Sequence, residues 1–194
     1  MLSEFGAVSA LEMDSVARDI AAKKTDNRFD IRAGRCPNEI PFAGQRFDLI
    51  CMFDVLEHID EDTATLTAAR ALLAKDGVML ITVPAYPWLW SAHDEFLHHK
   101  RRYSATALRE KAIAAGLRPL KLSYFNTVLF PLAATLRLKD RWQRRTSSSG
   151  NAVPPAAING ILRWLFAAER FLLGRFDLPF GVSLLCVLGA AHDR

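Results

Sequence analysis

Three residues with acid–base side chains, Asp54, Glu57 and His58, follow directly after the apolar run Phe47–Phe53. The run is short and almost continuously apolar, which is typical of a strand buried on both faces. Carboxylate and imidazole groups at such a strand end can accept or donate a proton and can orient a ligand. The sequence therefore predicts a ligand site at the carboxyl end of this strand.

A second apolar run, at 78–83, repeats this arrangement one helix later. It follows an Asp-Gly pair that suits a turn, and Tyr86 comes shortly after it. Between the two runs, apolar residues recur at helical spacing, and either Asp60 or Asp62 can cap the helix. Because parallel strands end at one edge of a sheet, we expect the groups after both strands to line one site.

The stretches FDLICMFDVLEHI and LLAKDGVMLITVP resemble the second half of the class I S-adenosylmethionine-dependent methyltransferases, of the type 11 and type 12 groups. In that family they are the fourth strand with its loop, then the helix end, turn and fifth strand. The resemblance covers most of the 194 residues. It implies an α/β fold with a Rossmann-like, doubly wound, mostly parallel sheet, an antiparallel final strand and a helical insertion before that strand.

The resemblance also implies S-adenosyl-L-methionine as the cofactor. A short strand at 7–11 ends at Glu12, whose carboxylate would accept hydrogen bonds from the ribose hydroxyls. The alternative is a helix-capping acid, although Asp14 can already cap the helix that follows. By the same resemblance, the cofactor-binding residues are Glu12, Met13, Gly34, Asp54, Val55 and His58.

The chain departs from the family pattern at two places. A third strand at 29–33 leads into GRCPNEIPF, which should pass under the adenine, but Arg35 and Cys36 stand where the family often has an acid. The first strand and its glycine-rich turn are missing, since only Gly6 precedes the Glu12 strand. The chain therefore resembles a fragment, and the strands flanking the missing one are expected to close up, to be bridged by another chain, or to be poorly ordered.

The segment from Tyr86 to Tyr103 is dense in functional side chains. Its aromatic residues are expected to wall an apolar pocket or to pack over the sheet edge, and its arginines to hold an anionic group or to lie on a solvated surface. His93 and Asp94 suit either an acid–base pair or structural roles, and His58 suits either catalysis or a hydrogen bond at a helix start. The candidate substrate-binding residues are Tyr86, Trp88, Trp90, Arg101, Arg102 and Tyr103, and the candidate catalytic residues are His58, His93 and Asp94.

Three regions are predicted: a truncated methyltransferase core at 1–125, a helical insertion at 126–181, and a final core strand with a tail at 182–194. The insertion contains a basic run at 139–145 and an amphipathic helix at 158–173. It is expected to pack against the sheet or a homodimer partner, to form a lid over an amphipathic acceptor, or to contact an anionic membrane surface.

Composition is consistent with one globular domain, because 51% of the residues are apolar and 24% are charged. The three cysteines are far apart, so neither a disulfide framework nor a zinc site is expected, and no metal is predicted. This cysteine usage suits a cytoplasmic protein. If the insertion contacts a membrane, the protein is expected to lie peripherally at the inner membrane surface. A net charge of +4 without interleaved aromatic residues does not indicate nucleic-acid binding.

The sequence thus predicts a methyltransferase that uses S-adenosyl-L-methionine on a small-molecule or lipid-like acceptor. The alternative is a non-catalytic remnant, or an interaction domain, that kept the fold and lost cofactor binding together with the glycine-rich turn.

Overall fold

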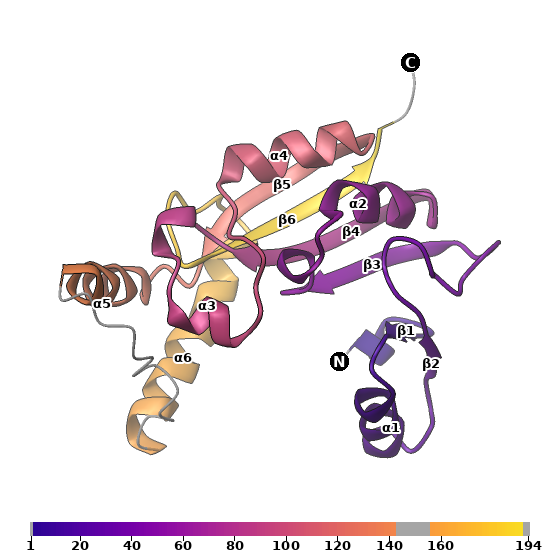
Figure 1. Cartoon of the computed structure of the whole chain (residues 1–194), viewed down its shortest axis with the longest axis horizontal. Helices are drawn as coiled ribbons and strands as arrows, with labels where there is room; N and C mark the ends of the chain where they lie inside the picture. Colours follow the sequence, from indigo (N-terminus) through magenta and orange to yellow (C-terminus); the bar gives the residue numbers. More distant parts are fainter. Residues whose placement is uncertain (1, 143–155, 192–194) are drawn as a thin grey trace.

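The computed structural model describes residues 2–142 and 156–191 (Figure 1). Most of the basic run predicted at 139–145 therefore lies outside the described residues. Within the described part, no helix has the length and apolar character needed to cross a membrane. The short helical elements are η1 (Leu2–Glu4), η2 (Leu56–His58), η3 (Pro87–Leu89) and α3 (Ala92–Phe96).

The N-terminal unit contains a pair of parallel strands joined by a helix: β1 (Ser9–Glu12), α1 (Ser15–Lys24) and β2 (Asp30–Ala33). Glu12 lies opposite Ala33, so both strands end at the same edge. The carboxylate of Asp14 accepts a hydrogen bond from the backbone N–H of Ala17 at 2.7 Å, which confirms Asp14 as the cap of α1.

A mixed four-stranded sheet forms the body of the protein, in the order β3-β4-β6-β5. β3 and β4 are parallel, whereas β6 runs antiparallel to both of its neighbours, so the predicted antiparallel final strand is confirmed. The strands are β3 (Phe47–Phe53), β4 (Leu73–Pro84), β5 (Leu117–Phe125) and β6 (Ser183–Ala190).

β4 begins earlier than the sequence predicts. Leu73 already pairs with Phe47, and the Asp76-Gly77 turn becomes an irregularity inside the strand. A Cβ atom on Gly77 would come 2.6 Å from the carbonyl oxygen of Phe47, so glycine allows the two backbones to approach here. The predicted turn at Asp76-Gly77 is therefore wrong, because both residues lie within β4 at a register irregularity.

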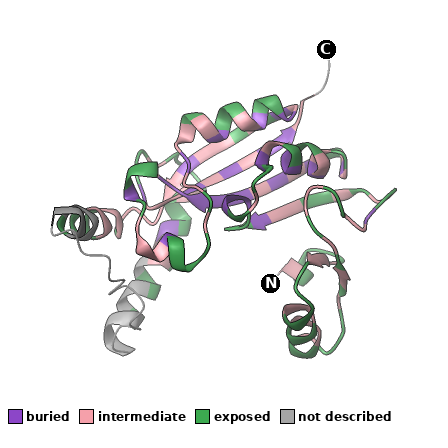
Figure 2. Ribbon diagram, in the orientation of Figure 1, coloured by how far each residue is buried: buried purple, intermediate pink, exposed green. Residues whose placement is uncertain are grey.

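Helices α2 (Asp62–Arg70) and α4 (Ala105–Ala114) lie on one face of the four-stranded sheet (Figure 1). Ser104 caps α4 through its hydroxyl, which accepts a hydrogen bond from the backbone N–H of Ala107 at 3.1 Å. The prediction that Asp60 or Asp62 caps α2 is wrong, because Glu61 holds the cap position and Asp62 turns inward. Figure 2 shows the buried residues concentrated on this sheet and its two helices, and the fully buried apolar ones include Leu56, Leu66, Met79, Ile81, Leu108 and Leu184.

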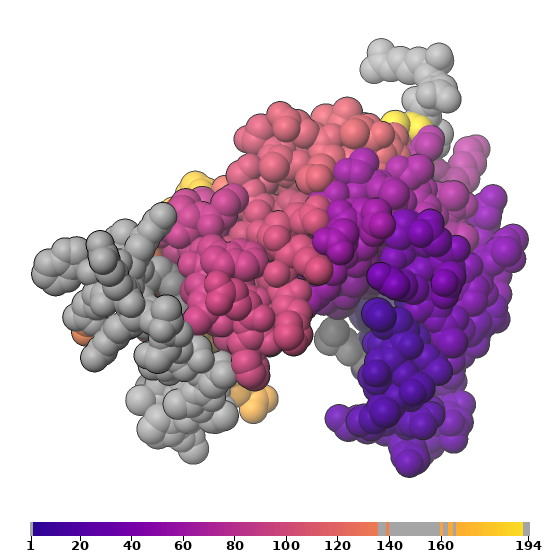
Figure 3. All heavy atoms as spheres, in the orientation of Figure 1, coloured from indigo at the N-terminus to yellow at the C-terminus, as the bar shows by residue number. Residues whose placement is uncertain are grey.

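The expected doubly wound sheet is interrupted between β1 and β3. Among the described strands, β1 pairs only with β2, and β3 pairs only with β4, so the strands flanking the missing one have not closed up. Leu49 and Phe53 on β3 remain 43% and 45% exposed. In the space-filling view the N-terminal unit forms a separate lobe with a recess beside it (Figure 3).

Two helices, α5 (Phe130–Trp142) and α6 (Ala156–Leu173), occupy the predicted insertion. Glu169 on α6 is only 6% exposed and accepts hydrogen bonds from the backbone N–H groups of Asn126 and Thr127, both at 2.9 Å. The hydroxyl of Thr127 donates to the carbonyl oxygen of Phe180 at 2.8 Å. One buried carboxylate therefore fastens α6 to the end of β5, where the insertion begins.

Replacing this carboxylate should lower the stability of the protein. Glu169→Ala leaves two backbone N–H groups without their acceptor, and we expect a loss of about 1–3 kcal/mol in the free energy of unfolding, measured by urea denaturation. Glu110→Ala, at an exposed position on α4, is the matched control and should change stability by less than about 0.5 kcal/mol. Equal stability of the two variants would contradict the fastening role of Glu169.

Candidate functional site

The turn after β3 is fixed to the neighbouring strand. The backbone N–H of Asp54 donates to the carbonyl oxygen of Thr82 at 3.0 Å and to its hydroxyl at 3.1 Å. Asp54 has a φ of 50°, a left-handed conformation that aspartate tolerates better than most residues. The exposed carboxylate of Asp54 thus lies at the edge of the sheet where the ligand site was predicted.

Glu57 follows on η2 and is enclosed in the protein. Its side chain is 0% exposed, and neither carboxylate oxygen has a hydrogen-bond partner among the described residues. Burial raises the pKa of Glu57 to about 7, and the Asp54 and Asp94 charges add to the rise. Because an enclosed carboxyl group without a partner is costly, it marks this point of the structure as a candidate functional site.

Asp94 is the centre of a second buried network. Its carboxylate accepts hydrogen bonds from Nε of Arg102 at 2.7 Å and from the backbone N–H of Ser91 at 2.9 Å, and it lies 3.0 Å from Nδ1 of His99. Burial acts to raise the pKa of Asp94, but Arg102 and His99 outweigh it and hold that pKa below its ordinary value. Asp94 is therefore ionised at neutral pH.

The structure pairs Asp94 with His99 and not with His93. In residues 2–142 and 156–191, no hydrogen bond joins the His93 ring to Asp94, and the buried Nδ1 of His93 has no partner. Neighbouring residues on a helix point in different directions, so the expected pair does not meet. The catalytic roles of His93 and Asp94 stay predictions.

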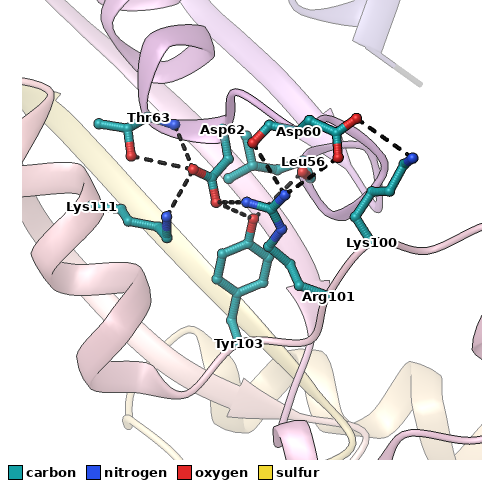
Figure 4. Close-up of polar contacts among 8 residues, drawn as sticks. All are labelled: Leu56, Asp60, Asp62, Thr63, Lys100, Arg101, Tyr103 and Lys111. Carbon is teal, nitrogen blue, oxygen red and sulfur yellow. Dashed lines mark hydrogen bonds and ion pairs between the residues drawn. The ribbon is translucent and has the colours of Figure 1, made fainter.

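The carboxylate of Asp62 binds three side chains, two from the loop after α3 and one from α4 (Figure 4). Its carboxylate accepts hydrogen bonds from Nη1 of Arg101 and Nζ of Lys111, both at 2.8 Å, and from the hydroxyl of Tyr103 at 2.9 Å. Burial acts to raise the pKa of Asp62, but Lys111 and Tyr103 outweigh it and keep that pKa below its ordinary value. Asp62 thereby joins α2, α4 and the loop after α3.

Removing the Asp62 charge should destabilise the protein. Asp62→Asn leaves Arg101 and Lys111 without their carboxylate. We expect the free energy of unfolding to fall by about 2–3 kcal/mol, a value reduced because both cations are partly exposed to solvent. Because the pKa of Asp62 is lowered, this contribution is present above its ordinary value of 3.8 and is lost as the pH falls. The difference in free energy of unfolding between Asp62→Asn and the wild type, measured by urea denaturation, should therefore become smaller below about pH 4.

Asp60→Asn is the matched control for this variant. Asp60 forms ion pairs with Lys100 and Arg101 but is 67% exposed, so its loss should cost less than about 1 kcal/mol. If both variants cost the same, Asp62 is not the central contact.

Four of the six predicted substrate-binding residues, Trp90, Arg101, Arg102 and Tyr103, have polar partners within the protein. Arg101, Arg102 and Tyr103 are held by buried carboxylates, and Tyr103 is only 1% exposed. Trp90 is 38% exposed, and its ring N–H donates to Glu95 at 3.4 Å. Substrate binding by these four residues stays a prediction.

Tyr86 and Trp88 belong to an aromatic cluster at the ends of β4 and β5. The ring of Tyr86 stacks on Tyr124 at 5.1 Å and lies 5.7 Å from Trp88 and 5.3 Å from Phe130. Phe130 also lies 5.7 Å from Phe180. Because Trp88 and Phe180 are 42% and 41% exposed, the cluster presents an apolar surface to solvent.

The N-terminal unit holds the other predicted cofactor residues. Met13 and Gly34 line an open cavity of about 650 Å³ at the ends of β1 and β2. The carboxylate of Glu12 accepts a hydrogen bond from the backbone N–H of Asp14 at 2.9 Å. A Cβ on Gly34 would come 2.8 Å from the ring of Pro41, so this position requires glycine.

The remaining predicted residues, Val55 and His58, lie with Asp54 after β3, and both are exposed. Sequence reasoning missed His99 altogether, and it placed Glu57 at the predicted ligand site without indicating that its side chain is enclosed. The signal available for Glu57 was its place four residues after the end of β3 at Phe53, but nothing in the sequence indicated that it is buried.

The fold and this edge of the sheet define a known class of protein. A family model described as a methyltransferase domain matches residues 1–122. The chain belongs to this family, within the class I S-adenosylmethionine-dependent methyltransferases. No match is found among curated protein sequences.

Solved structures share the fold at low sequence identity. The methyltransferase complexed with the Haloferax volcanii Trm112 methyltransferase activator is 18% identical with a TM-score of 0.60, covering 96% of this chain and 73% of its own. An S-adenosylmethionine-dependent methyltransferase from Clostridium acetobutylicum is 11% identical with a TM-score of 0.59, and the match covers 96% of this chain and 76% of that protein. The [4+2]-cyclase SpnF is 14% identical with a TM-score of 0.55, and the match covers 96% of this chain and 68% of that protein.

Proposed function

We propose that this chain transfers a methyl group from S-adenosyl-L-methionine to a small-molecule or lipid-like acceptor. The observation that carries the proposal is the placement of Glu12, Gly34 and Asp54 at the ends of β1, β2 and β3 in a chain of this family. These are the positions at which an open α/β sheet binds its ligand.

The residues of the N-terminal unit fit the cofactor. The open cavity beside Met13 and Gly34 offers room, and Glu12 would supply an acceptor for ribose hydroxyls. The bound cofactor supplies an already activated methyl group. The protein then has to place the acceptor atom in line with that group and to remove a proton when the acceptor is a hydroxyl or an amine.

Cofactor affinity should depend on Glu12. Glu12→Ala removes a charged acceptor at the end of β1, next in sequence to the cavity residue Met13, and we expect S-adenosyl-L-methionine to bind about 1–3 kcal/mol more weakly by calorimetry, roughly five- to 150-fold in Kd. Asp19→Ala, at an exposed position of α1 in the same unit, is the control and should leave affinity unchanged. Equal affinities of the two variants, with both folded, would rule out the ribose assignment.

The aromatic cluster supports an apolar acceptor. Tyr86, Trp88, Phe130 and Phe180 gather beyond the carboxyl end of β4, on the side of the sheet where Asp54 and His58 follow β3. An exposed aromatic surface at this edge suits a ring or an acyl chain better than a small polar acceptor.

Methylation should therefore depend on Trp88. With labelled cofactor and a panel of phenols and acylated phenols, Trp88→Ala should lower kcat/KM about ten- to 100-fold while leaving cofactor affinity unchanged. Phe96→Ala, at a position 63% exposed on α3 and outside the cluster, is the control and should keep full activity. Full activity of the Trp88 variant would place the acceptor elsewhere.

A second candidate function is a binding domain without methyl transfer. One observation favours it: among the described residues, no strand pairs with β1 on the side away from β2. The fold also occurs in a [4+2]-cyclase, so it does not define one reaction. If the wild-type chain fails to bind S-adenosyl-L-methionine in the calorimetry above, this second function becomes the better one.

A further inference from the structure

Glu57, His58 and His99 are the one group of three metal-ligating side chains in the described part of the chain. Their candidate ligand atoms all lie within 4.8 Å of one another. Glu57 and His58 come from η2, and His99 comes from the loop after α3. The backbone N–H of Lys100 donates to the carbonyl oxygen of Glu57 at 2.8 Å, so the two segments are held together next to these side chains.

The Asp94 carboxylate orients the His99 ring toward Glu57. Nδ1 of His99 lies 3.0 Å from the buried, ionised carboxylate of Asp94 and donates a hydrogen bond to it. The other ring nitrogen, Nε2, faces Oε1 of Glu57 at 4.0 Å. An outer carboxylate that fixes the ring in this way is a regular feature of histidine metal ligands.

His58 lies directly beside this ring. The His58 and His99 rings meet edge to face with centroids 4.8 Å apart. Both imidazoles therefore stand within reach of a shared ion next to Glu57.

Glu57 and His99 do not form a hydrogen bond with each other. At 4.0 Å, Nε2 of His99 and Oε1 of Glu57 are too far apart for a hydrogen bond. Two ligand atoms that each lie about 2.0–2.2 Å from a shared ion are separated by roughly 3–4 Å. The fully buried Glu57 carboxylate, without any hydrogen-bond partner in the described residues, is the group that such an ion would satisfy.

We propose that Glu57, His58 and His99 bind one divalent first-row transition-metal ion. Two imidazoles with one carboxylate suit zinc, iron, cobalt or manganese, whereas magnesium and calcium prefer oxygen ligands. Three protein ligands leave coordination positions open for water or for an oxygen atom of a bound molecule. This assignment departs from the sequence-based expectation of no metal, which rested on the cysteines.

Cobalt(II) tests the site directly, because its visible absorption reports the ligand field while calorimetry gives the stoichiometry. We expect the metal-stripped wild-type chain to bind one Co²⁺ per molecule and to lose that absorption when Zn²⁺ is added. Glu57→Gln and His99→Asn should each weaken Co²⁺ binding by about 100-fold or more, a larger effect than is usual for residues that only orient a metal ligand. Neither readout requires methyl transfer or S-adenosyl-L-methionine, so the result is independent of the proposed function.

His98→Asn is the matched control. His98 adjoins His99 but is exposed, and its φ of 57° suits asparagine, so this variant should bind Co²⁺ like the wild type. His58→Asn keeps the test decisive if a buried variant fails to fold, because His58 is exposed and its loss should weaken binding without unfolding the chain. The proposal is overturned if the wild type binds no Co²⁺, or binds it no more tightly than His58→Asn.

Discussion

Two consecutive arginines each neutralise a different buried carboxylate, and the geometry of the site depends on this constraint. Arg101 forms an ion pair with Asp62, the first residue of α2, and Arg102 forms one with Asp94 on α3. The same loop carries His99 and donates the Lys100 N–H to Glu57. Losing either ion pair would therefore move the loop that faces the turn after β3.

The two buried ion pairs fix the position of the loop that carries His99, and they contribute less to the stability of the fold. Bringing two charges out of water costs about as much as their attraction returns, so a buried ion pair adds little compared with apolar packing. Removing one partner is costly, however, because the other charge stays buried. The stabilising part of the structure is instead the apolar core between the sheet and helices α2 and α4, where Leu66, Ile81 and Leu108 are fully enclosed.

The sequence predicted the architecture well, because strands and helices follow from hydrophobic spacing and from turn and capping residues. The Asp14 cap is confirmed on these grounds, and the antiparallel last strand, which the family resemblance implies, is confirmed as well. The site was harder to predict, since a charged residue does not reveal its partner. Arg101 and Arg102 looked available for an anionic substrate, and η2 is too short for a periodic pattern to show that Glu57 is buried.

The interruption between β1 and β3 has a consequence for local unfolding. Backbone hydrogen bonds run without a break from β3 to β5, but none in the described residues continues from β3 to β1. No residue of β1, α1 or β2 is buried, so little apolar contact couples these elements to the main core. The N-terminal unit can therefore open without the rest, and its amide protons should exchange with solvent far faster than those of β4 and β6.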